Sequence, residues 1–304
     1  MKTHAARSIL ILFIIAVISG CELNPVDSPD PATITEEIST ETIAREIGRL
    51  HNAGLDFILH QMKARVQPFR DREDALDFFR VSAEQFIQST AGADHERIAE
   101  VFDMDRIFAG PEQIRRDSPA RPGFRYGNTA LELSRDQRHH FNRLFEVYSK
   151  HKDDKVFERD HTPLLRRINR DIEQSYTPEQ ILLVQGVTEI LIASSNYWKE
   201  HRTEWIQEIS RLHNIDIPDT STVYAGDIAA NPCSAFPMVP MCQAINWGEV
   251  IEADGGGLID GVVGNALYWV VVGPPGWLAG ATILGGGVAA ASTQELYHQI
   301  MDLL

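Results

Sequence analysis

Apolar side chains recur at the spacing of an α-helix through most of the region between residues 36 and 213. Positions three and four residues apart lie on one face of a helix, so this spacing indicates helices that bury one side. The clearest stripe consists of Phe141, Leu144, Phe145 and Tyr148. Together with a capping box of Ser134 and Gln137, it predicts a helix over residues 134–150.

Further stripes of the same kind predict helices over residues 43–62, 76–86, 95–108 and 162–175. Another begins at Thr177 and Pro178, a pair typical of a first helical turn. It continues to Leu212, either as one long helix or as two helices joined near Ser194. The strict apolar and polar alternation of strands is essentially missing. The sequence therefore predicts an all-α fold, a helical bundle.

Two proline-containing segments interrupt the pattern and predict long irregular loops, residues 109–133 and 214–247. Loops of this length are uncommon inside a compact domain and are usually functional or disordered. The first carries four arginines, Arg115, Arg116, Arg121 and Arg125. They form a local positive spot suited to an anionic group or an acidic partner, and the alternative is a solvated loop that balances nearby carboxylates.

Residues 248–304 differ in composition from the rest of the chain. No charged residue or histidine occurs from Gly261 through Gln294, but Pro274 and Pro275 divide this stretch into halves too short to span a bilayer comfortably. The pattern predicts a hairpin of two apolar helices and a terminal helix. Small residues at a spacing of four favour close helix packing and include Gly257, Gly261, Gly276, Gly280, Ala281, Gly285 and Ala289.

Three arrangements of this glycine-rich hairpin remain open. It completes the core of the helical body, inserts into a bilayer with the help of interfacial tryptophans, or forms a flexible surface segment. The many Val, Leu, Ile and Trp side chains count against the last arrangement, because exposing them to water would be costly. The packing of the hairpin, inside the body or away from it, decides between the other two.

The first 20 residues have the parts of an export signal. Lys2 and Arg7 precede ten apolar residues, Ile9–Ile18, and this run is too short to form a stable membrane span. We therefore expect residues 1–20 to direct export of the chain.

The end of this region resembles the lipobox of bacterial lipoproteins, an aliphatic residue, two small residues and a cysteine: Ile18, Ser19, Gly20 and Cys21. The resemblance implies that residues 1–20 are removed and that Cys21 carries acyl chains such as palmitate, which hold the protein on a membrane. Residues 21–35 are then a flexible tether. Glu22 is not the aspartate associated with inner-membrane retention, which favours the outer membrane, with the body facing the periplasm or the cell surface.

The charge of the chain limits its partners. The 304 residues include 28 Lys and Arg against 43 Asp and Glu, a formal charge of -15. Removal of residues 1–20 takes away Lys2 and Arg7 and no carboxylate, so the mature chain is at -17. Nucleic-acid binding requires an excess of basic side chains against the phosphates, so no nucleic-acid partner is expected.

With Cys21 acylated, only Cys233 and Cys242 remain, both in the second irregular segment. Exported proteins meet oxidising conditions, so we expect one disulfide between them. The alternatives are two free thiols or a metal pair. A metal site would need further Cys or His residues at short spacing, and the sequence provides none nearby.

The sequence contains none of the common motifs for catalysis, nucleotide binding or zinc binding. Neither a cofactor nor a metal is expected. An enzyme remains an alternative because catalytic residues often lie far apart in sequence, and a pocket lined by His51, His60 or His201 with carboxylates would favour it. His51 itself lies at the edge of an apolar stripe and is expected to be a hydrogen-bonded residue of the core or its boundary.

Two short clusters and the glycine-rich tail resemble uncharacterised exported bacterial proteins; the clusters are His51, Asn52, Gly54 and Leu55, and Ser194, Ser195, Tyr197 and Trp198. This resemblance implies no activity. The leading expectation is a lipid-anchored envelope protein with a body at 36–213, a structural or interaction role and an envelope protein as partner. The alternative is a membrane-active protein that inserts the glycine-rich hairpin at 248–304.

Overall fold

The computed structural model describes residues 39–91, 135–151, 154–170, 176, 178–215, 244–261 and 276–303. These residues form seven α-helices and one 3-10 helix, and they contain no strand. The elements are α2 (Thr40–Ala64), α3 (Arg72–Ala91), α7 (Arg135–Ser149), η2 (Asp154–Phe157), α8 (Thr162–Arg170), α9 (Pro178–Leu212), α11 (Trp247–Gly261) and α13 (Gly276–Leu303). The predicted all-α class is confirmed for the part of the chain that is described.

The predicted helices of the body agree with the observed ones. Both stripes in the first part of the body extend into longer helices, α2 and α3, and the stripe before residue 150 lies in α7. The chain between Pro178 and Leu212 is one helix of 35 residues, which decides between the two predicted forms. The expected helix at 95–108 and the irregular segment at 109–133 lie outside the described residues.

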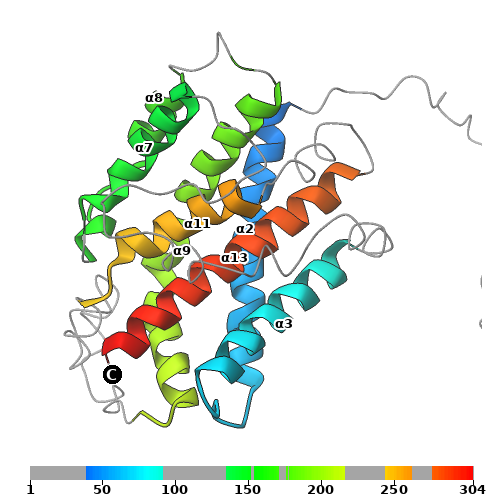
Figure 1. The fold of residues 1–304 in the computed structure, drawn as a ribbon, viewed down its shortest axis with the longest axis vertical. Helices are drawn as coiled ribbons and strands as arrows, with labels where there is room; N and C mark the ends of the chain where they lie inside the picture. The colour runs from blue at the N-terminus through cyan, green and yellow to red at the C-terminus, as the bar shows by residue number, and fades with distance from the viewer. Residues whose placement is uncertain are drawn as a thin grey trace, which may run out of the picture. The chain divides into compact units, whose positions relative to one another are not determined.

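Helix α13 lies at the centre of the packing. The second half of the expected hairpin and the terminal helix are one continuous helix, Gly276–Leu303. It packs against α2, α3 and α11, and Figure 1 shows it running between α11 and α3. Most of its described side chains from Gly280 to Ile300 are buried. For this half, the arrangement in which the apolar segment completes the core is confirmed; residues 262–275 lie outside the described part.

Small residues let α13 approach its neighbours closely. A Cβ atom on Gly285 would lie 2.7 Å from the backbone nitrogen of His51 and 2.8 Å from the carbonyl carbon of Leu50, so only glycine fits there. One turn further along, the Cβ atom of Ala289 lies 3.1 Å from the position that a Cβ atom on Gly54 of α2 would take. The small-residue spacing seen in the sequence is thus the seam on which α13 meets α2.

Polar side chains of α13 bond to the backbone of their own helix. Ser292 and Thr293 donate their hydroxyls to the carbonyl oxygen of Ala289, at 3.3 and 2.8 Å, and Thr282 donates to Leu278 at 2.9 Å. Because the bonding partners lie within the helix, these hydroxyls are buried without an unpaired group. The helix can therefore be surrounded by apolar neighbours on nearly every side.

The far ends of α2 and α9 are tied together by one arginine. The guanidinium of Arg211 donates to the carbonyl oxygens of Met62, at 2.7 Å, and Arg65, at 3.1 Å, which closes the last turn of α2. Helix α9 ends at Leu212, and Asn214 just beyond it has a φ of 54°, the left-handed conformation common after a helix. The hydrogen bonds of Arg211 therefore hold the C-terminal ends of α2 and α9 together.

Substitution of Gly285 tests the close approach of α13 and α2. We expect Gly285→Ala to lower the free energy of unfolding by about 1–3 kcal/mol, because the new methyl group meets backbone atoms that have no room to move. The cost outweighs the gain of about 1 kcal/mol that alanine brings to a helix. Urea denaturation followed by circular dichroism measures the change.

The matched control is Gly186→Ala in α9. There the new methyl group would lie 3.1 Å from Cδ2 of Leu258, the mobile end of a side chain, so the change is expected to be neutral within about 1 kcal/mol. Equal effects of the two substitutions would contradict the proposed seam.

Candidate functional site

A buried carboxylate lies where α2, α9 and α11 meet. Asp254 of α11 is 0% exposed, and its Oδ1 lies 3.0 Å from Nε2 of His51, which is also 0% exposed. An unpaired charge in such a position would cost several kcal/mol, so the carboxylate needs partners. His51 is a hydrogen-bonded residue of the core, as its place on the apolar stripe predicts.

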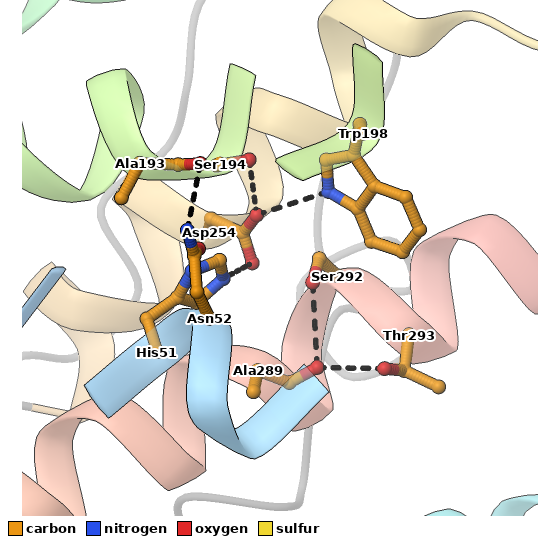
Figure 2. Close-up of polar contacts among 9 residues, drawn as sticks. All are labelled: His51, Asn52, Ala193, Ser194, Trp198, Asp254, Ala289, Ser292 and Thr293. Atoms are coloured by element: carbon orange, nitrogen blue, oxygen red, sulfur yellow. Dashed lines mark hydrogen bonds and ion pairs between the residues drawn. The ribbon is translucent and has the colours of Figure 1, made fainter. Parts of the chain in front are cut away.

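The second oxygen of the carboxylate is bonded from α9. Ser194 donates its hydroxyl to Oδ2 at 2.5 Å, and the indole Nε1 of Trp198 donates to the same atom at 3.4 Å. Figure 2 shows the carboxylate of Asp254 between the imidazole of His51 and these two donors. Three helices therefore meet on one side chain.

Asn52 orients the imidazole. Its Nδ2 donates to the carbonyl oxygen of Ala193 at 3.2 Å, which directs its Oδ1 toward Nδ1 of His51 at 2.9 Å. An amide oxygen only accepts, so the hydrogen-bond network assigns a proton to Nδ1 of His51. On the other side of the ring, Nε2 lies 3.0 Å from Oδ1 of Asp254.

The cluster contains a serine, a histidine and an aspartate, but not in the order of a nucleophilic triad. In a triad the histidine bonds to the serine and the aspartate supports the histidine. Here Asp254 lies in the middle, and Ser194 donates to the carboxylate rather than to a base. All three side chains are 0% exposed, so a substrate has no access to them. The arrangement stabilises the contact of three helices.

A second polar group of side chains lies at the surface, around a hollow of about 190 Å³ between α9 and the segment that joins η2 to α8. Its polar lining consists of Arg159, Asp160, His161, Ser195, Asn196 and Lys199. Tyr148 of α7 and Phe157 of η2 supply aromatic walls. Figure 1 shows α7 and α8 side by side at one edge of the body. This hollow is the accessible candidate site of the described residues.

The surroundings of Asp160 and His161 in the hollow determine the charge state of each side chain. Asp160 accepts the backbone N–H of Thr162 at 2.9 Å, and hydrogen bonds from Thr162 hold the pKa of this carboxyl below its usual range. Burial lowers the pKa of His161, which keeps its ring neutral near pH 7. Nε2 of His161 lies 3.1 Å from the carbonyl oxygen of Val156 and donates to it.

The tyrosine of the wall is held by its hydroxyl group. Tyr148 donates to the carbonyl oxygen of Leu191 at 3.3 Å, and burial raises the pKa of its phenol well above the usual range. The phenol therefore stays protonated at every physiological pH. Its ring lies edge-on to His161, with 5.2 Å between the ring centres. The two rings form one rigid side of the hollow.

A third polar group is Glu252 on α11. Its Oε1 is buried and has no hydrogen-bond partner among the described residues. Burial, with a smaller contribution from the charge of Glu249, raises the pKa of Glu252 to about 8. The carboxyl group is therefore largely protonated at neutral pH, which removes the cost of a buried charge.

Most site residues expected from the sequence lie outside the described residues. These are Cys21, Cys233, Cys242, Arg115, Arg116, Arg121 and Arg125. The three histidines considered for an enzyme do not share a pocket. His51 is sealed in the core, His60 is exposed, and His201 stacks on Tyr197 and lies 3.6 Å from Glu204. None of the three lines the hollow.

Asp254 and the lining of the hollow were not identified as candidates from the sequence. A signal for Asp254 was present, because it is one of four acidic residues in a glycine-rich helix of fifteen residues, and any of them that is buried must find a partner. The hollow had no such signal. Its residues come from α7, η2, α8, α9 and the segment between η2 and α8, and its charged residues resemble ordinary solvated charges in sequence.

Comparison with protein-family models, curated proteins and solved structures finds no match for the chain. Among the described residues, no group of three or more His, Cys, Asp or Glu side chains is placed to hold a metal ion. No helix in the described ranges is both long and apolar enough to cross a membrane.

Removal of the central carboxylate tests the buried cluster. We expect Asp254→Ala to lower the free energy of unfolding by about 3–5 kcal/mol, because His51, Ser194 and Trp198 all lose a buried partner. Ser194→Ala removes one bond only and should cost about 1–2 kcal/mol. Chemical denaturation at pH 7 measures both, and Asp302→Ala at the exposed end of α13 is the control.

Glu252 predicts a pH-dependent difference in stability. Its pKa is about 8 in the folded chain against 4.5 for the free side chain, so between these values the folded state holds a proton that the unfolded state has released. Stability from this group therefore falls as pH rises through that window. Glu252→Gln should leave stability unchanged at pH 4 and raise it by about 1–3 kcal/mol at pH 8.5.

Urea denaturation of both chains across this pH range measures the difference, with Asp302→Asn as a control for the loss of one surface carboxylate. A constant difference between Glu252→Gln and the parent chain at all pH values would contradict the raised pKa.

Proposed function

We propose that the protein is a lipid-anchored protein of the cell envelope, attached through Cys21, whose helical body acts by binding a partner in the envelope. The support for the anchor is the export signal followed by Ile18, Ser19, Gly20 and Cys21. The outer membrane is the favoured location, by the same sequence argument from Glu22. Two or three acyl chains hold a protein on a bilayer stably where one chain does not.

The observation that carries this proposal is the burial of α13. The glycine-rich helix is the most apolar part of the described chain, and its side chains contact α2, α3 and α11. An apolar helix used in this way is not left over to bind a membrane. Membrane attachment then falls to the lipidated end of the chain, which the tether at residues 21–35 separates from the body.

The same burial counts against the membrane-active alternative. Releasing α13 into a bilayer would break its contacts with three helices and expose the small-residue seam of α2. It would also open the hydrogen-bonded cluster on Asp254, which lies next to this seam through His51 and Leu50. Insertion would be favourable only if the free energy gained from contact with lipid outweighed the free energy lost with all of these contacts.

Binding rather than catalysis is favoured by the position of the reactive side chains. The serine, histidine and aspartate of the body are enclosed, and the accessible hollow holds an imidazole and a phenol whose hydrogen-bond partners are backbone carbonyl groups. No described residue of the hollow is positioned as a nucleophile beside a base. A partner would instead meet a rigid helical surface with charges of both signs.

A Cys21→Ser substitution tests the proposed anchor. In bacteria that express the chain and are fed a labelled fatty acid, the parent chain should carry label and fractionate with membranes. The variant should lose the label entirely and move to the soluble fraction, because the thiol is the site of acylation.

The control for general thiol effects is Cys233→Ser, which should remain labelled and membrane-bound. Label or membrane association that persists in Cys21→Ser would overturn the proposal. Circular dichroism of both variants verifies that the helical body is intact.

A further inference from the structure

We propose that the hollow between α9 and the start of α8 binds a small zwitterion, a molecule with a carboxylate and an ammonium group such as a free amino acid. The inference rests on the residues of the hollow alone and does not depend on lipid anchoring. It goes beyond the interaction role, because it assigns a small-molecule site to the body.

The size of the hollow limits its occupant. A cavity of about 150 Å³ in another protein accommodates benzene, a molecule of six non-hydrogen atoms. The hollow encloses about 190 Å³ and is open on one side. It therefore has room for roughly five to ten non-hydrogen atoms. Typical sites for drug-sized ligands are larger and mostly apolar, so this hollow suits a small polar molecule.

The charges of the hollow select a carboxylate. Arg159 and Lys199 both line it, and the charge of Lys199 also acts on the carboxylate of Asp160. The guanidinium matches the two oxygens of a carboxylate, and the amine adds a third donor. The amide of Asn196 supplies a neutral donor nearby, while the side chain of Ser195 is hydrogen-bonded to Tyr148. In a chain with a formal charge of -15, two cationic side chains beside one hollow form a local site for an anionic group.

The same hollow has acceptors for an ammonium group. Asp160 is ionised and accepts hydrogen bonds from the backbone N–H and the side chain of Thr162, and a carboxylate with about four acceptor positions can accept more. His161 donates through Nε2 to Val156, so Nδ1 of its neutral ring is an acceptor as well. The side chain of His161 is only 9% exposed, so this nitrogen is placed by the fold rather than by solvent.

Groups of both kinds line one hollow of molecular size. A simple anion would satisfy Arg159 and Lys199 but would face the charge of Asp160, and a simple cation would face the two basic side chains. A zwitterion pairs with both sets at once. The combination favours a molecule that carries both charges over either half of it.

The test is isothermal titration calorimetry on the full chain with three zwitterions of graded size, glycine, L-serine and L-glutamine. Propionate and ethylamine are the probes that carry one charge only. We expect at least one zwitterion to bind with a dissociation constant below about 10 mM, and at least tenfold more tightly than either single-charge probe. Failure of all three zwitterions to bind would overturn the proposal.

Variants locate the binding. Lys199→Gln and Arg159→Gln should each weaken binding of the zwitterion about tenfold, because each removes a charge-assisted hydrogen bond. Asp160→Asn should weaken it similarly, while asparagine still caps the N–H of Thr162 and preserves the start of α8. The matched control is Lys150→Gln, an exposed lysine of the same region that does not line the hollow.

The results separate a site in the hollow from binding elsewhere. Affinity that is unchanged in Lys199→Gln and Arg159→Gln places the zwitterion at another position and overturns the assignment. Propionate that binds as tightly as the zwitterions also overturns it, because the role of Asp160 would then be excluded. Unchanged thermal unfolding of the three variants verifies that any loss of affinity is local.

Discussion

The close contact of α13 with α2 is the constraint on which the rest of the structure depends. At Gly285 the two backbones lie so near that a single methyl group would contact the backbone of His51 and Leu50. A helix held this tightly is surrounded on nearly every side, so it needs small residues where neighbours cross and apolar residues elsewhere. The absence of charge in α13 from Gly276 through Gln294 is the consequence in sequence. The apolar tail is the centre of the body and not an addition to it.

Enclosure of α13 also decides what happens to the polar groups around it. The turn of α2 that meets Gly285 carries His51, and His51 faces Asp254 on α11, so the carboxylate lies beyond the reach of water. Its three contacts, one with His51 of α2 and two from Ser194 and Trp198 of α9, use both oxygens. A shift of either helix by one turn would leave the carboxylate unpaired, which is costly in a low-dielectric interior. The cluster therefore allows only one register for these helices.

The helices of the body could be predicted because each has a local cause. Phe141, Leu144 and Phe145 repeat at helical spacing, and Pro178 occupies a first turn, so α7 and α9 follow from short-range rules. Gly285 and Ala289 signalled a close helix contact, but the sequence did not say whether the partner was another helix of the body or a membrane helix. That choice depends on α2, more than 200 residues away, and no local pattern records it.

The candidate site depends even more on contacts between residues that are far apart in sequence. His51 was identified as a residue of the core from its position on α2. Its partner Asp254 was not, because the distinctive sequence feature of α11 is its glycines. The hollow is lined by Arg159, Asp160 and Lys199, which are common surface residues, and Lys199 is far in sequence from the other two. The candidate site forms only because α8 starts beside the middle of α9, which brings charges of both signs to the lining of one hollow. The side chains of Ser194, His51 and Asp254, types that are common in catalytic sites, are sealed in the core. Those of Arg159, Asp160 and Lys199, types that are common on any protein surface, line the accessible hollow.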